Sequence, residues 1–142
     1  MLLHSAYRAM NYALSFPSLP VALDFFHRWP AHRHAAQLIV ERHGEFDGNQ
    51  YYLLDAAAGW LEGSHPLAAT LLRRAMIEDT LDGAKSTRYK HAARHLLECR
   101  SLVAGIRDFG EFEPHEVFVS RLRARHGRKT GFWSQVSEGT GG

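Results

Sequence analysis

Apolar residues recur at spacings of three and four along most of this chain, and strict alternation of apolar and polar residues is nearly absent. Spacings of three and four place side chains on one face of an α-helix, whereas alternation is typical of a half-buried strand. The longest stripe of this kind consists of Tyr89, Ala93, Leu96, Cys99, Val103 and Ile106. The pattern therefore predicts an all-α fold.

Proline and glycine divide this pattern into about seven helices. Pro66 and Pro114 suit the first turn of a helix, where the missing amide hydrogen costs nothing, and Gly127 suits a helix end. Ser86 or Thr87 can cap the sixth helix with its hydroxyl oxygen. The expected ranges are about 3–14, 21–29, 32–43, 50–62, 66–81, 87–106 and 114–127.

Short connections between these ranges predict antiparallel helical hairpins. The segment 34–41 resembles the segment 91–98, and both carry paired alanines that allow helices to approach closely. We therefore expect a solenoid-like, tetratricopeptide-like bundle without a regular repeat. One domain should cover residues 1–133, and residues 134–142, which end in Gly-Thr-Gly-Gly, should form a disordered tail.

The composition narrows the class of protein. The formal net charge is only +2 with histidines neutral, so the overall charge makes no strong case for nucleic acid. The single cysteine, Cys99, excludes an intramolecular disulfide and a multi-cysteine zinc site. We expect no membrane span and no secretory leader, because no apolar run is long enough, and hence a cytoplasmic protein.

Four segments carry a resemblance to a known family: 52–55, 65–75, 91–96 and the closing 126–133. Through them the stretch from Tyr51 to Trp133 resembles a bacterial family of uncharacterised helical proteins. Its C-terminal part is also similar to the helical region that accompanies SWIM-type zinc fingers, although one cysteine cannot supply that finger's ligands. The resemblance implies a helical, repeat-like fold without known catalytic residues. Members of the family tend to be longer than this chain. A shortened solenoid leaves an uncapped apolar face, which favours self-association or a partner.

One histidine cluster raises the question of a metal site. His91, His95 and Glu98 are spaced to project from one helical face, and two imidazoles with a carboxylate are a plausible zinc set. A solvated polar stripe is the simpler interpretation, and we expect no metal and no cofactor. Lys90 and Arg94 on the same helix are candidates for a binding surface.

The basic run near the C-terminus has two interpretations. Arg121, Arg125, Arg128 and Lys129, flanked by Trp133, can form a phosphate-binding face with a stacking aromatic ring. Alternatively, the cations complement the end of a helix that stops at Gly127, and the aromatic residues that follow pack back on the core.

Arg121 and His126 also match the loose Arg-x4-6-His pattern of HEPN-type ribonucleases, in which histidine acts as acid and base and arginine stabilises charge. Arginine and histidine are common in this chain, so the match has little specificity.

The sequence thus predicts a non-enzymatic helical interaction module that binds a protein partner or associates with itself. The alternative is a nucleic-acid-directed protein, either RNA-binding or a HEPN-like ribonuclease. A small phage-type inhibitor or a toxin-antitoxin component also fits the size, but no residue selects either.

Overall fold

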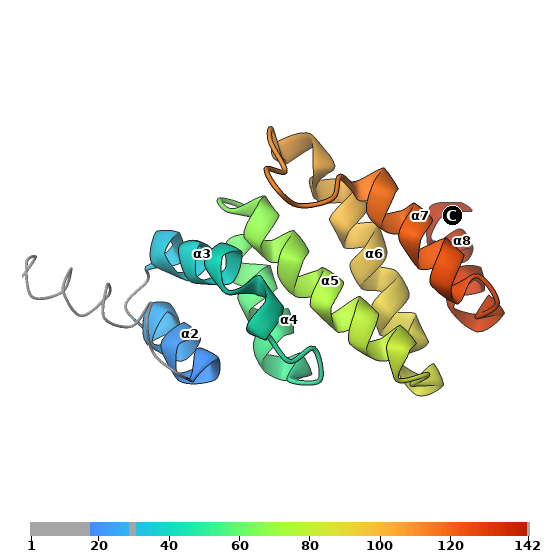
Figure 1. Ribbon diagram of the computed structural model, residues 1–142, viewed down its shortest axis with the longest axis horizontal. Helices are drawn as coiled ribbons and strands as arrows, with labels where there is room; N and C mark the ends of the chain where they lie inside the picture. The colour runs from blue at the N-terminus through green and yellow to red at the C-terminus, as the bar shows by residue number, and fades with distance from the viewer. Residues whose placement is uncertain (1–17, 29–30, 142) are drawn as a thin grey trace, which may run out of the picture.

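The computed structural model describes residues 18–28 and 31–141, and all regular elements in these ranges are helical (Figure 1). This confirms the predicted all-α fold. Three short 3-10 turns accompany the α-helices, at His43–Glu45, Ser86–Arg88 and Val103–Gly105. The α-helices are α2 (Leu19–Arg28), α3 (His32–Glu41), α4 (Tyr51–Leu61), α5 (Pro66–Asp82), α6 (Tyr89–Leu102), α7 (His115–His126) and α8 (Thr130–Gly141).

The helices α2 to α7 correspond to six of the predicted ranges, and the first predicted range lies outside the described residues. The sixth helix is shorter than predicted at both ends. Ser86 and Thr87 form a 3-10 turn and do not cap α6, which starts at Tyr89 without a side-chain cap. Val103 continues the apolar spacing but lies in the 3-10 turn Val103–Gly105, which directly follows α6.

The C-terminal segment forms helix α8, whereas the sequence predicted a disordered tail after Trp133. Phe132 is fully buried, and Trp133 is only 9 % exposed. Together with Val136 they give α8 an apolar face that packs against α6. Gly139 lies so close to Leu97 of α6 that an added Cβ would overlap its side chain. Gly139, one of the glycine residues that suggested disorder, therefore permits close helix packing.

The helices follow one another across the molecule, with α5 between α4 and α6 (Figure 1). The most extensive helix contacts are those of α4 with α5, α5 with α6, and α6 with α8. By contrast, α7 makes few close backbone approaches and depends on long side chains to reach its neighbours. No helix of the described part of the chain has the length and apolar character needed to cross a bilayer.

Paired alanines lie where helices meet. Four such pairs, in α3, α4, α5 and α6, are at most 8 % exposed. A methyl side chain lets two helix backbones approach more closely than a longer side chain would. The pairs are Ala35-Ala36, Ala57-Ala58, Ala68-Ala69 and Ala92-Ala93.

The packing of α8 predicts that Phe132→Ala will lower the free energy of unfolding by about 3–5 kcal/mol, because it removes a fully buried ring and leaves a cavity. Urea denaturation measures the change. Gln135→Ala, at an exposed position of the same helix, is the control and should stay within about 0.5 kcal/mol of wild type. Equal stabilities of both variants would show that α8 contributes nothing to the fold.

Candidate functional site

Two consecutive arginines in the middle of α5 are buried. Arg73 is 2 % exposed and Arg74 is 7 % exposed. Successive residues of an α-helix project about 100° apart, so the two guanidinium groups reach different neighbours. Arg73 reaches α6 and the end of α4, and Arg74 reaches α7.

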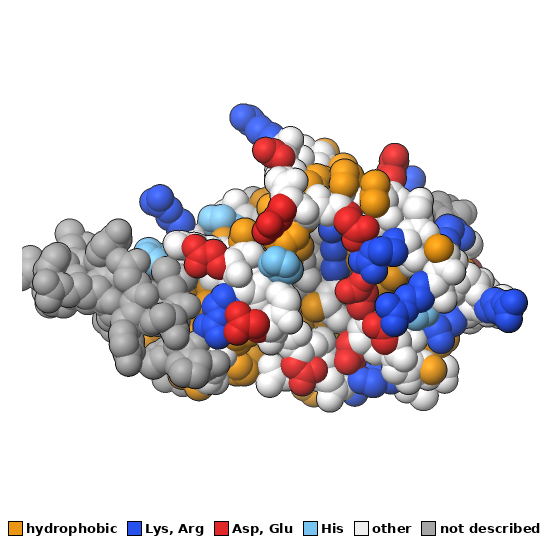
Figure 2. Space-filling model, in the orientation of Figure 1, with side chains coloured by type: hydrophobic (Ala, Val, Ile, Leu, Met, Phe, Trp, Pro, Cys, Tyr) orange, Lys and Arg blue, Asp and Glu red, His pale blue; other side chains and the backbone are white. Residues whose placement is uncertain are grey.

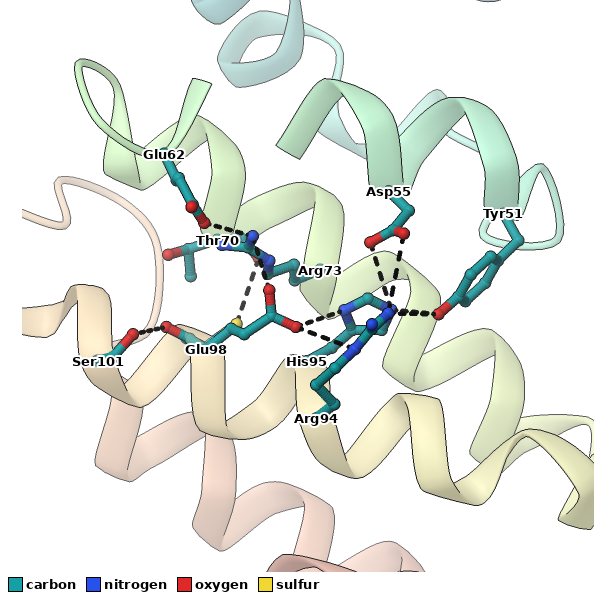
Figure 3. Close-up of polar contacts among 10 residues, drawn as sticks. Tyr51, Asp55, Glu62, Thr70, Arg73, Arg94, His95, Glu98 and Ser101 are labelled. Carbon is teal, nitrogen blue, oxygen red and sulfur yellow. Dashed lines mark hydrogen bonds and ion pairs between the residues drawn. The ribbon is translucent and has the colours of Figure 1, made fainter. Parts of the chain in front are cut away.

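Arg73 joins three elements through one nitrogen. Its NH2 donates to Glu62, directly after α4, at 2.5 Å and lies 2.8 Å from Glu98 Oε2 of α6 (Figure 3). Both carboxylates are partly exposed, with 45 % and 31 % of their side-chain surface accessible. A buried cation is tolerable only when carboxylates compensate it, so these pairs fix how α4, α5 and α6 meet.

The cluster continues from Glu98 to a buried histidine. His95 is fully buried, and its Nε2 lies 2.7 Å from the hydroxyl oxygen of Tyr51 (Figure 3). Because Arg94 donates to that oxygen, the tyrosine hydroxyl is free to donate to Nε2. This assigns the imidazole proton to Nδ1, which faces Glu98 Oε1 at 3.4 Å without forming a hydrogen bond.

Burial sets the protonation of these groups. Desolvation lowers the pKa of His95 to about 4, against the opposing attraction of Asp55, and the cations Arg94 and Arg73 lower it further. The pKa of Tyr51 is raised, mainly by burial. His95 is therefore neutral near pH 7. A fully buried base beside a protonated tyrosine cannot reach a substrate, so the arrangement stabilises helix packing and does not form an acid–base site.

The alternative metal set of His91, His95 and Glu98 is not brought together. His91 is exposed and packs its ring against that of Tyr51 at 5.8 Å, whereas His95 is occupied by the tyrosine hydroxyl. Among the described residues, no group of three or more His, Cys, Asp or Glu side chains could hold a metal ion. Cys99 is buried, and desolvation raises the pKa of its thiol to about 12, which opposes a role as ligand or nucleophile.

Arg74 anchors helix α7. Its guanidinium carbon lies 4.6 Å from the ring centre of Phe118 and 5.6 Å from that of Phe109. Its Nε and NH2 are buried without a hydrogen-bond partner, and desolvation lowers its pKa. A desolvated cation over an aromatic face gains about 2 kcal/mol. This side-chain contact connects α5 with α7, although the backbones of the two helices do not approach each other closely.

The predicted basic face of α7 is largely turned toward carboxylates. Arg121 NH2 lies 2.7 Å from Glu78 of α5 and 2.9 Å from Glu113, and these contacts raise the pKa of Arg121. One turn along α5, Asp82 lies 3.0 Å from His126 Nε2 and 3.4 Å from Arg125. Figure 2 shows acidic side chains beside basic ones over α5 and α7.

The same carboxylates contact the two residues of the ribonuclease candidate, Arg121 and His126. Arg121 is engaged with two carboxylates, and His126 is only 7 % exposed. A phosphate would have to displace glutamate from the arginine and aspartate from the histidine. The geometry thus gives Arg121 and His126 structural partners rather than a common reactive centre.

Trp133 closes the turn between α7 and α8. Its Nε1 donates to the backbone oxygen of His126 at 2.9 Å, and Arg123 lies 4.1 Å from its ring centre. The indole is therefore occupied and does not offer a free face for stacking. Arg128 remains exposed in the turn, with Lys129 partly exposed. On α6, Lys90 is exposed and Arg94 meets Asp55 and Glu98 at 3.8 and 3.4 Å.

An open groove of about 940 Å³ lies between α6, α7 and α8. On α7 its lining residues Glu116, Val119, Ser120 and Arg123 follow the spacing of one helical face, distinct from the face that carries Phe118 and Leu122. Exposed apolar side chains lie near the start of α7 (Figure 2). Val103 and Val117, which are 37 % and 50 % exposed, belong to the groove.

Sequence reasoning missed both the buried arginines and the groove. The arginines had a signal: α5 is apolar over most of its circumference between Leu67 and Ile77, and a charge in such a helix must be buried and compensated. The sequence carries no signal for the groove, because its walls come from three helices and their separation depends on the contacts of α7.

These features define an all-α protein in which buried arginines of α5 contact α6, α7 and the end of α4, and in which a groove lies open between α6, α7 and α8. The chain belongs to the family of unknown function DUF6880, whose model matches residues 3–135. The matched range extends beyond the stretch from Tyr51 to Trp133 that carries the resemblance. Neither the curated proteins nor the solved structures contain a match to the chain.

The burial of neutral His95 predicts a pH-dependent stability. Unfolding returns the pKa from about 4 to about 6.5, so between these values the unfolded chain binds a proton that the folded chain does not. The free energy of unfolding should therefore fall as the pH falls from 6.5 to 4, by about 3 kcal/mol from this group.

Urea titrations at a series of pH values measure this loss. His95→Gln should show a smaller decrease across the interval, whereas the exposed His91→Gln should behave like wild type. The same pH dependence in His95→Gln and wild type would contradict the assignment of a neutral buried imidazole.

Proposed function

We propose that the chain is a non-enzymatic helical module that binds a protein partner through the groove between α6, α7 and α8. The groove carries the proposal. It combines about 940 Å³ of open space with apolar side chains that remain exposed at its margin. Contiguous exposed apolar surface is costly in water and marks interaction sites in globular proteins.

The groove is bordered by three helices, α6, α7 and α8. Its three walls are helical faces, and a partner helix would lie along them with apolar side chains directed inward. A second copy of the chain is one form that the partner can take. The polar cluster around Arg73 supports the proposal indirectly, because it fixes α6, which forms one wall of the groove.

We further propose that the stacking is solenoid-like and related to tetratricopeptide repeats. The buried alanine pairs of α3 to α6 support this class. A cytoplasmic location is supported by the unpaired, buried thiol of Cys99. The similarity of the C-terminal helices to those that accompany SWIM-type zinc fingers would give this chain the helical part without the metal-binding part.

Nucleic-acid binding through the basic run has less support. It requires Arg121, Arg125 and Trp133 to face a ligand, and each of them already has a partner within the protein. The exposed Arg128 and the partly exposed Lys129 are the members of the predicted face that keep it open as a second candidate.

Site-specific photocrosslinking tests the proposed function. A photoreactive residue replaces Val117 at the groove, and in a control it replaces Tyr52, which is 92 % exposed on α4 and does not line the groove. In cells of the organism that encodes the protein, position 117 should yield one defined protein adduct that position 52 does not. A second copy would appear as an adduct of twice the mass of the chain.

A blocking variant makes the result specific. Ser120→Trp fills the groove from the α7 face and should abolish the adduct at position 117. The absence of any adduct at position 117, or identical adducts at both positions, would overturn the proposed function.

A further inference from the structure

We propose that the groove selects an amphipathic helix that carries acidic residues beside its apolar face, with Arg100 and Arg123 as the recognition cations. This inference rests on the proposed function, since it names the chemistry of the partner that the groove receives.

The first observation is which arginines are paired with a carboxylate of the protein. Arg73, Arg94, Arg121 and Arg125 each lie within 4 Å of at least one carboxylate. Among the described residues, Arg100 and Arg123 make no ion pair, and both line the groove. The two arginines that line the groove thus have no carboxylate partner among the described residues, in contrast to these four.

The positions of these two cations suit a helix between them. Arg100 belongs to α6 and Arg123 to α7, so they come from different walls of the groove. Arg123 is held by its contact with the Trp133 ring at 4.1 Å. An ordered guanidinium loses less side-chain entropy when it binds a carboxylate than a mobile one does.

A third observation concerns the end of the groove at His115. Its Nδ1 is buried and has no hydrogen-bond partner. Burial lowers its pKa, and the positive charges of Arg74 and Arg100 lower it further. The opposing charge is that of Glu116, which lines the groove and raises the same pKa. Arg100, which interacts with His115 and also lines the groove, supplies positive charge that an incoming anion would meet there.

The apolar lining decides between a helix and a small anionic amphiphile such as a fatty acid. Leu96, Val119 and Val136 provide apolar surface inside the groove, which either ligand could cover. Val103 and Val117 add exposed apolar surface to the same lining. A helix contacts the interior and the margins together, so the observations favour a protein segment.

Selection from a display library of random 16-residue peptides on the full chain tests the inference. Enriched peptides should have apolar residues at i, i+3, i+4 and i+7, with Asp or Glu at flanking positions. Enrichment of neutral or basic flanks would overturn the inference.

A synthetic peptide of the selected consensus then measures the role of the arginines by fluorescence anisotropy. The double variant Arg100→Gln/Arg123→Gln should bind it roughly 2- to 30-fold more weakly, as expected for loss of two exposed ion pairs, and with less dependence on salt. The matched control Arg33→Gln/Arg107→Gln removes the same charge from exposed positions outside this groove and should bind like wild type. Equal affinities of the two double variants would overturn the inference.

The outcomes separate the two proposals. If the Val117 adduct forms in cells but the library shows no acidic preference, the groove binds a protein and the chemistry named here is wrong. If neither an adduct nor an enriched peptide appears, the proposed function itself fails. Saturable binding of a fluorescent fatty acid to the same groove, without peptide enrichment, would replace the helix with a small amphiphile and overturn the inference.

Discussion

The burial of Arg73 and Arg74 side by side in α5 is the constraint on which the rest of the structure depends. Neither guanidinium can lose its charge at any pH that the protein survives, so each must find compensation inside the fold. Arg73 finds it in two carboxylates, which ties α5 to α4 and α6. Arg74 finds it in the ring of Phe118, which ties α5 to α7. Two adjacent residues thus fix the positions of three neighbouring helices.

The attachment of α7 explains why the protein has a groove. An arginine over a ring and ion pairs between long side chains hold helices farther apart than alanine contacts do. The paired alanines bring the earlier helices together, whereas α7 remains separated from α6. Residues of α8 form a third wall of the space, and the groove lies open along the face of α7 that carries Val119 and Arg123. We therefore attribute the groove to the long side-chain contacts between α5 and α7 that compensate the buried and paired charges.

The basic run illustrates how much of a site can be read from residue types. Its location at the end of a helix, the stop near Gly127 and the packing of the aromatic pair were all predictable, because periodicity and helix termini are local properties. The partners of its arginines were not. Glu78 and Asp82 lie more than forty positions earlier in the chain, and no spacing rule connects them to Arg121 and His126. An expected interaction surface proved to include an internal contact between α5 and α7.

By itself the sequence determined the helices, their order and most of their limits, because apolar spacing, proline and glycine act within a few residues. It did not determine α8, where the closing Gly-Thr-Gly-Gly suggested disorder but Gly139 allows close contact with Leu97 of α6. Only the tertiary structure decided which arginines pair with carboxylates of the same chain and which do not. That choice depends on distances between helices, and the distances follow from side-chain pairs that are far apart in the chain.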